Sequence, residues 1–119
     1  MFPLNPHSEE RMKIFAFWEK NNQAAAAWFR PFIPALKNAG HTVVTPDIFQ
    51  DGPVVEIERH VPNADVTVLI GPTNGGFYAM TENTAQQCRK PMITLGQEID
   101  GDITVEEILR RLENACPVA

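Results

Sequence analysis

Residues 65–83 read DVTVLIGPTNGGFYAMTEN and join a continuous apolar run to a helix-like segment through a glycine-rich hinge. A short apolar run without alternation is typical of a strand that is buried on both faces of a sheet. The hinge has neither the GxGxxG spacing of dinucleotide-binding loops nor the GxxxxGK[ST] pattern of a P-loop. We expect a strand over residues 65–70 and a helix over about residues 77–89, joined by a loop that either holds a ligand or only turns the chain.

Strand-like and helix-like segments alternate along the rest of the chain. Further strands are expected at residues 12–18 (MKIFAFW), 41–45 (HTVVT) and 91–95 (PMITL), and further helices at residues 22–39, 53–60 and 103–115. Strict alternation predicts a parallel sheet with helices on both faces, because each crossover is right-handed. We predict a small doubly wound α/β domain over residues 12–119, similar to flavodoxin-like and Rossmann-like folds, with strand order 2-1-3-4 and a tail at residues 1–11.

The first predicted helix carries two prolines in its apolar stripe. Pro31 and Pro34 each remove a backbone donor, so the helix is expected to kink or restart near Arg30. Asn21 or Asn22 is expected to cap its start, and Gly40 to end it in a left-handed conformation.

Composition limits the classes of function. The chain has 119 residues, an apolar fraction of 44% and a formal charge of −5. An acidic domain without a basic stripe argues against nucleic-acid binding, and the absence of a long apolar window argues against a membrane span. Cys88 and Cys116 form no metal-ligand cluster with the three histidines, so we expect no metal, no cofactor and ordinary thiols in the cytoplasm.

The predicted topology places a crevice at the carboxyl ends of the strands, where ligands gather in doubly wound sheets. This crevice is expected between the strands that end at Trp18 and Ile70, with the hinge on its rim. Gly75 and Gly76 would let the backbone approach a ligand, and Thr73 and Asn74 would supply hydrogen bonds. Alternatively, the hinge glycines and polar residues only turn and cap the chain.

Four further side chains are candidates for the same crevice. Glu82 lies one turn in from the hinge, in a row with Tyr78, and either reaches the crevice or lies on the surface. Asp47 either accepts hydrogen bonds from ribose hydroxyls or caps a turn. Trp18 either stacks on a flat ligand or belongs to the core.

The helix after the hinge has one face that we expect to be buried. At about 100° per residue, Phe77, Thr81 and Ala85 fall on this face, and Tyr78 and Glu82 flank it.

The order of sequence blocks is similar to that of the nucleoside 2-deoxyribosyltransferase superfamily, which includes nucleotide N-glycosidases. The likeness covers most of residues 13–95 and lies in KIFAFW, LKNAGHTVVTPD, ADVTVLI, the hinge, a glutamate-bearing helix and RKPMITL. The resemblance implies that Glu82 is the nucleophile on the sugar C1′, that residues 73–76 contact the sugar or phosphate, and that a homodimer completes the site. Asn74 stands where the family usually has an aspartate.

Two functions are therefore expected as alternatives. The first is a hydrolase or transferase that acts on the N-glycosidic bond of a nucleoside or nucleotide, with Glu82 as nucleophile and Asn74, Asp47 and Trp18 positioning the ligand. The second is a non-catalytic α/β module that binds a nucleotide-like ligand or a protein partner at the same crevice.

Overall fold

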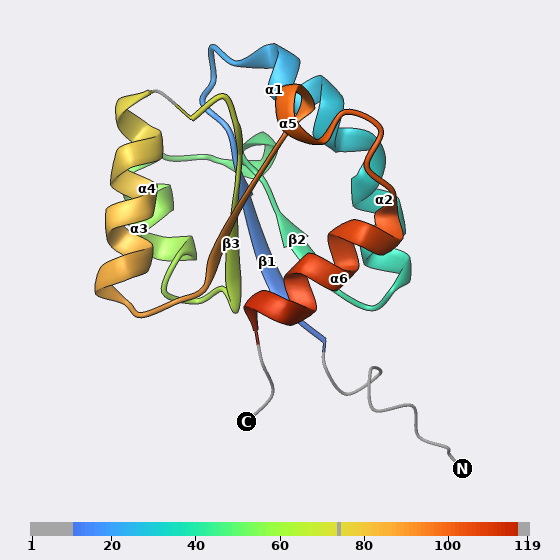
Figure 1. Ribbon diagram of the computed structural model, residues 1–119. Coiled ribbons are helices and arrows are strands. Elements are labelled where there is room, and N and C mark those ends of the chain that lie inside the picture. The colour runs from blue at the N-terminus through green and yellow to red at the C-terminus, as the bar shows by residue number, and fades with distance from the viewer. Residues whose placement is uncertain (1–10, 74, 117–119) are drawn as a thin grey trace.

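A computed structural model of the chain describes residues 11–73 and 75–116. The described residues form a four-stranded, all-parallel sheet with the order β2-β1-β3-β4 (Figure 1). The strands are β1 (Lys13–Phe17), β2 (Thr42–Val44), β3 (Val66–Gly71) and β4 (Met92–Gly96). The predicted α/β class, strand order and parallel pairing are confirmed. Of the predicted tail at residues 1–11, only Arg11 lies within the described residues.

The two central strands form the floor of the core. In β1 every residue after Lys13 is buried, and in β3 every residue before Gly71 is buried. They pair in register from Ile14 opposite Val66 to Phe17 opposite Leu69. Burial on both faces explains why these strands read as continuous apolar runs, whereas the edge strands β2 and β4 are partly exposed.

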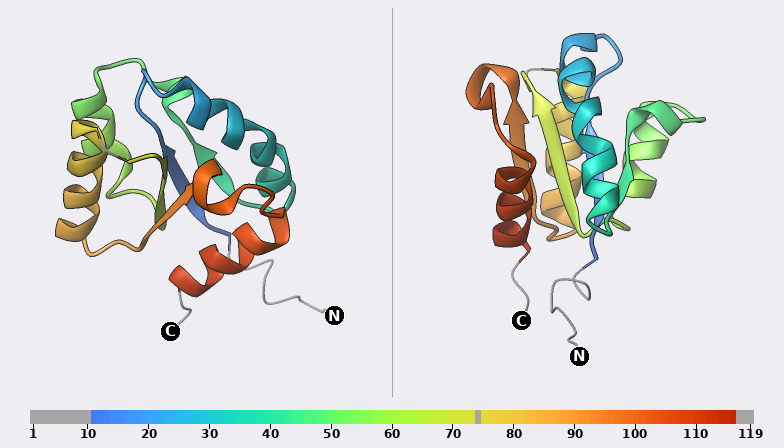
Figure 2. Two further views of the ribbon diagram at one scale, coloured as in Figure 1. Left: turned by 45° about the horizontal axis from the view of Figure 1, so that its top comes forward. Right: turned by 90° about the vertical axis from the view of Figure 1, so that its right-hand side faces the viewer.

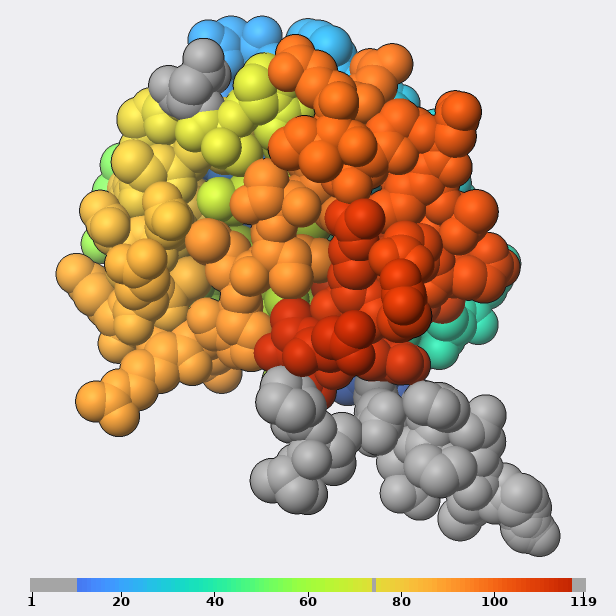
Figure 3. Space-filling model, in the orientation of Figure 1, coloured from blue at the N-terminus to red at the C-terminus, as the bar shows by residue number. Residues whose placement is uncertain are grey.

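Helices cover both faces of the sheet. In Figure 1, α3 (Pro53–His60) and α4 (Gly76–Gln87) lie to the left of the strands, α2 (Ile33–Asn38) and α6 (Val105–Ala115) lie to the right, and α1 (Gln23–Phe29) lies at the top. The left panel of Figure 2 shows the same two layers. In the space-filling view, α5 (Gln97–Asp100) and α6 (orange to red) form much of the right-hand surface and α4 much of the left (Figure 3).

The first helix breaks where its prolines predict. α1 passes into a 3₁₀ turn at Arg30–Phe32, and α2 follows with Pro34 in its first turn. The Asn22 side chain caps α1 by accepting a hydrogen bond from the Ala25 amide at 3.2 Å. Gly40 has a φ of +100°, the left-handed conformation expected after the helix.

Two short elements were not predicted. Residues 46–48 form a 3₁₀ turn within a segment expected to be loop, and α5 (Gln97–Asp100) directly follows β4. The Asp100 carboxylate holds α5 in place, because it accepts a hydrogen bond from the Gly96 amide at 3.0 Å and pairs with Arg111 at 2.8 Å. Such tertiary contacts leave no periodic signal in a four-residue segment.

The expected buried face of α4 is confirmed for Thr81 and Ala85 and wrong for Phe77. Tyr78, expected to flank this face, is buried, whereas Phe77 is 37% exposed. The Tyr78 hydroxyl accounts for its burial, because it has three hydrogen-bond partners in the loops above the sheet.

Neither a membrane helix nor a metal cluster is found in residues 11–73 and 75–116. No helix there combines the length and apolar character needed to cross a bilayer. No group of three or more histidine, cysteine, aspartate or glutamate side chains there is arranged to hold a metal ion.

Candidate ligand-binding cleft

A cleft of ≈ 910 Å³ opens at the carboxyl ends of β1 and β2. It is lined by the end of β1 and the loop after it, by the segment between Pro46 and Pro53, and by Phe77 at the start of α4. The volume is in the range of small-molecule sites, and ligands of doubly wound sheets bind beyond the carboxyl ends of the strands, where this cleft lies. We take this cleft as the candidate site.

Aromatic side chains give the cleft its apolar surface. The Phe49 ring stacks on the His60 ring with centroids 6.1 Å apart and an angle of 5° between the planes. It also stacks on the Phe15 ring, with centroids at 6.1 Å. These contacts hold Phe49 on the cleft wall, and the partly exposed Phe77 side chain lines the same cleft. Both rings can contact a flat ligand.

Asp47 lines the cleft with its carboxylate held in a two-point ion pair. Arg30 donates from Nε at 3.0 Å and from Nη2 at 2.7 Å to the two carboxylate oxygens. This hydrogen-bonded pair holds the pKa of Asp47 below its ordinary value, so the group is ionised at neutral pH. The same guanidinium lies 5.7 Å from the ring centroid of Trp18, which is only 2% exposed although it borders the cleft.

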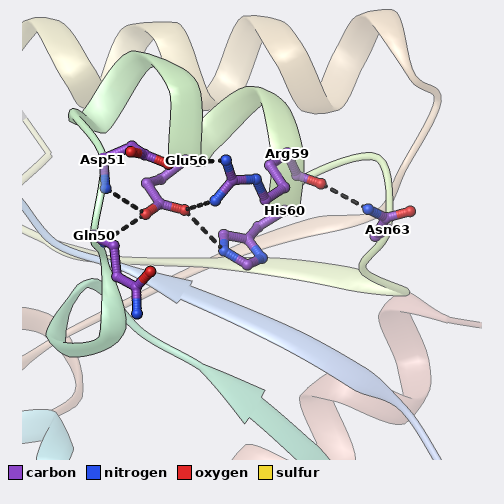
Figure 4. Close-up of polar contacts among 6 residues, drawn as sticks. All are labelled: Gln50, Asp51, Glu56, Arg59, His60 and Asn63. Carbon is purple, nitrogen blue, oxygen red and sulfur yellow. Dashed lines mark hydrogen bonds and ion pairs between the residues drawn. The ribbon is translucent and has the colours of Figure 1, made fainter.

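The opposite wall depends on Glu56, a carboxylate that is only 2% exposed (Figure 4). Glu56 Oε2 accepts hydrogen bonds from the backbone amides of Gln50 at 2.6 Å and Asp51 at 2.9 Å. Glu56 Oε1 lies 2.9 Å from Arg59 Nη1 and 3.2 Å from His60 Nε2. These contacts tie the loop at residues 50–51 to α3 and fix the cleft wall.

The electrostatics of this wall follow from the same contacts. The amide hydrogen bonds from Asp51 and Gln50 lower the pKa of Glu56, so this buried carboxylate stays charged. The Arg59 guanidinium also pairs with the Asp51 carboxylate at 3.0 Å. Asp51 thus lines the cleft with its charge already balanced by a neighbour.

The glycine-rich hinge receives a side chain from another loop. Glu19 Oε2 accepts hydrogen bonds from the α4 amides of Phe77 at 2.9 Å and Tyr78 at 3.2 Å. A Cβ atom at Gly75 would lie 1.9 Å from this oxygen, so only glycine leaves room for the carboxylate. In this conformation, the start of α4 is therefore occupied by an anion of the protein itself.

Tyr78 joins the ends of β1 and β3. Its hydroxyl donates to the Ile70 carbonyl at 2.7 Å and accepts from the Glu19 amide at 3.2 Å and from Asn22 Nδ2 at 3.1 Å. Asn22 Nδ2 also donates to the Pro72 carbonyl at 3.3 Å. The crevice expected between these two strand ends is therefore narrowed to a polar hollow of ≈ 320 Å³, and the larger cleft lies on the β2 and α3 side of β1.

The predicted site residues separate into three groups. Trp18 and Asp47 line the cleft, and Gly75 and Tyr78 line the hollow. The third group lines neither and is exposed: Thr73, Gly76 and Glu82. Asn74 lies outside the described residues.

Comparison of the chain with known protein families, with curated proteins and with solved structures found no match. The function must therefore be argued from the cleft itself.

Sequence reasoning missed four contributors to the site, one of which is Phe77, whose side chain was expected on the buried face of its helix. Phe49 and Asp51 lie in a segment expected to be loop, and Glu19 follows β1 in a loop without a motif. A signal for Glu19 did exist: an acidic residue directly after a buried strand faces the same sheet edge as the helix start that follows the hinge. Opposite charges at one edge predict a contact.

Proposed function

We propose that this protein binds a nucleoside-like small molecule in the cleft at the carboxyl ends of β1 and β2. The observation that carries the proposal is the combination of aromatic rings and oriented carboxylates in one cleft of suitable size. Phe49 and Phe77 offer apolar ring surface to a base. Asp47 and Asp51 keep unused acceptor positions on their oxygens for sugar hydroxyls, because a carboxylate has about four lone-pair sites.

The test of binding is isothermal titration calorimetry with a panel of nucleosides and their bases. Phe77→Ala is the diagnostic variant, because this partly exposed side chain lines the cleft and its loss costs little core packing. We expect at least fivefold weaker binding to this variant. Ile99→Ala is the matched control, because Ile99 is 80% exposed and does not line the cleft. Equal affinity of wild type and Phe77→Ala, or no binding by wild type, contradicts the proposal.

A second candidate function is cleavage or transfer at the N-glycosidic bond, as in the nucleoside 2-deoxyribosyltransferase-like proteins that the sequence resembles. The observation in its favour is a carboxylate at the cleft: within the described residues, no donor is hydrogen-bonded to Glu19 Oε1. The Glu82 carboxylate, to which the resemblance assigns the nucleophile, lies on the exposed side of α4. A catalytic role for Glu82 therefore requires a ligand placed outside the cleft.

Base release from nucleosides and nucleotides distinguishes these roles. If wild type releases base and Glu82→Ala does not, the family role of Glu82 stands. If Glu19→Ala alone abolishes release, Glu19 is the reacting carboxylate. If ligands bind without release, the protein is a binding module.

The resemblance also implies a homodimer, and we propose one that forms beside the cleft. Ile48, Val54 and Val55 are about half exposed in the segments that border the cleft, with relative exposures of 56%, 46% and 47%. Exposed apolar side chains are a common feature of protein interfaces. Sedimentation velocity over a range of concentrations measures the oligomeric state directly.

A further inference from the structure

We propose that the cleft accepts uncharged nucleoside-like ligands and rejects their phosphorylated forms, and that Glu19 is the residue that determines this specificity. This inference rests on the proposed binding function and narrows its ligand class.

The start of α4 is already occupied by a carboxylate of the protein. In α/β folds the amides at the start of a helix that follows a glycine-rich loop are a common site for phosphate. Here the amides of Phe77 and Tyr78 already donate to Glu19 Oε2, at 2.9 and 3.2 Å. A phosphate at this position would have to displace a carboxylate that makes the same charge-assisted hydrogen bonds.

Glu19 is held in this position through both its backbone and its side chain. Its amide donates to the Tyr78 hydroxyl at 3.2 Å, and that hydroxyl is itself anchored on the Ile70 carbonyl at 2.7 Å. Gly75 provides the space for the carboxylate, since a Cβ atom there would lie within 2.6 Å of both carboxylate oxygens. The contact between Glu19 and α4 is therefore preorganised.

Carboxylates of the protein already balance the arginine charges near the cleft. Each guanidinium near it is already used, because Arg30 pairs with Asp47 at 2.7 Å and Arg59 pairs with Asp51 at 3.0 Å. Lys20 is the remaining cation among the described lining residues, and it is exposed. A single lysine is a point charge without the fork geometry that arginine offers to phosphate. A phosphate dianion would thus add negative charge beside Glu19, where both nearby guanidinium groups are already paired with aspartates.

Ready displacement of Glu19 by phosphate would have the opposite effect on affinity. If phosphate displaced Glu19 readily, the carboxylate would act as a placeholder for the ligand, and nucleotides would bind more tightly than nucleosides. The two behaviours differ in the sign of the effect that phosphate has on affinity.

The first experiment measures inorganic phosphate binding by thermal shift and calorimetry, which does not depend on any nucleoside. Glu19→Ala is compared with wild type and with Glu106→Ala. Glu106 is a matched control, because it is an exposed carboxylate in the first turn of α6 and does not line the cleft. We expect phosphate to bind Glu19→Ala at least tenfold more tightly than the other two proteins. Equal affinity in all three overturns the role of Glu19.

The second experiment compares adenosine, cytidine and thymidine with their 5′-monophosphates on wild type. We expect the best nucleoside to bind at least tenfold more tightly than its monophosphate, and the ratio to fall below threefold in Glu19→Ala. A monophosphate that binds wild type as tightly as its nucleoside overturns the inference. If no nucleoside binds wild type, the proposed function fails, whereas the phosphate experiment still decides whether Glu19 excludes anions.

Discussion

Replacement of Tyr78 by phenylalanine tests the connection between the two loops above the sheet. Tyr78 is the single tyrosine of the chain, and it is only 2% exposed. The substitution removes the hydroxyl and keeps the ring, which packs edge-on against Phe17 with centroids 5.4 Å apart. Any loss of stability therefore reports on hydrogen bonds and not on a cavity.

The magnitude follows from the three partners of the hydroxyl. The Ile70 carbonyl and the Glu19 amide lose a partner inside the protein, whereas Asn22 is partly exposed and still donates to Pro72. A hydrogen bond contributes about 0.5–1.5 kcal/mol, and a buried group left without a partner costs about 1–3 kcal/mol. We expect the unfolding free energy to fall by about 2–3 kcal/mol, which lowers the melting temperature by roughly 8–12 °C for a chain of this length.

The pH dependence of stability tests the Tyr78 hydroxyl independently. Burial raises the pKa of Tyr78, so the folded state favours the neutral hydroxyl. The corresponding stability is present below the pKa of an unfolded tyrosine, about 10, and is lost as the pH rises through the folded value. Because the chain has one tyrosine, absorbance at alkaline pH follows this group directly. Tyr78→Phe should lose less stability than wild type over the same alkaline range.

Urea unfolding at neutral pH, with the slope unchanged between variants, is the assay. Thr81→Val is the matched control in the same helix. Its buried hydroxyl donates to the Phe77 carbonyl at 2.7 Å within α4, and that carbonyl keeps its helical partner, so we expect a loss of about 1 kcal/mol or less. The reasoning is refuted if Tyr78→Phe costs under about 1 kcal/mol, or no more than Thr81→Val.

Three further predictions concern the walls of the site and the surface beside it. Gly75→Ala should displace the Glu19 carboxylate and cost about 1–2 kcal/mol, and in urea unfolding its effect should not add to that of Glu19→Ala, because both remove the same two hydrogen bonds. Glu56→Gln should lose less stability than wild type as the pH falls into the acid range. The pKa of Glu56 is lowered in the folded state, so the stability that its charge contributes is present above the unfolded pKa of about 4 and is lost as the pH falls through the folded pKa. Melting temperatures between neutral and acid pH measure this, and an equal acid loss in both proteins contradicts it. Val54→Asp should shift a dimer to monomer in sedimentation velocity without lowering the melting temperature of the monomer, because Val54 is 46% exposed; an unchanged sedimentation coefficient would exclude Val54 from the interface.

The fold could be predicted because its signals are local. Apolar runs marked β1 and β3 as buried strands, and proline and glycine marked the break after α1 and the end of α2. Strict alternation with right-handed crossovers then leaves few possible strand orders. The sheet order could therefore be predicted, and the structure confirms it. The helix α5 was missed because its position depends on the contacts of Asp100.

The site was harder to predict because its geometry depends on single hydrogen bonds between distant segments. Thr81 and Ala85 are buried as expected, but Phe77 lines the cleft and Tyr78, expected on the flank, lies in the core. Periodicity cannot resolve which of two neighbouring aromatic residues is buried. The partner that decides it, the carbonyl of Ile70, is a backbone group that no side-chain pattern reveals.

The hinge shows why a glycine-rich turn before a helix is an ambiguous signal. Gly75 makes room for an anion at the start of α4, as it would in a phosphate site, but the anion is the Glu19 side chain, which lies 58 residues away from Phe77 in the sequence. Both arrangements satisfy the same amides and the same helix dipole, so both select glycine at the same place. What separates them is the charge that surrounds the hinge. In this cleft both neighbouring arginines are already paired with aspartates, and this balance, more than the glycines, is the ground for our proposal that phosphorylated ligands are rejected.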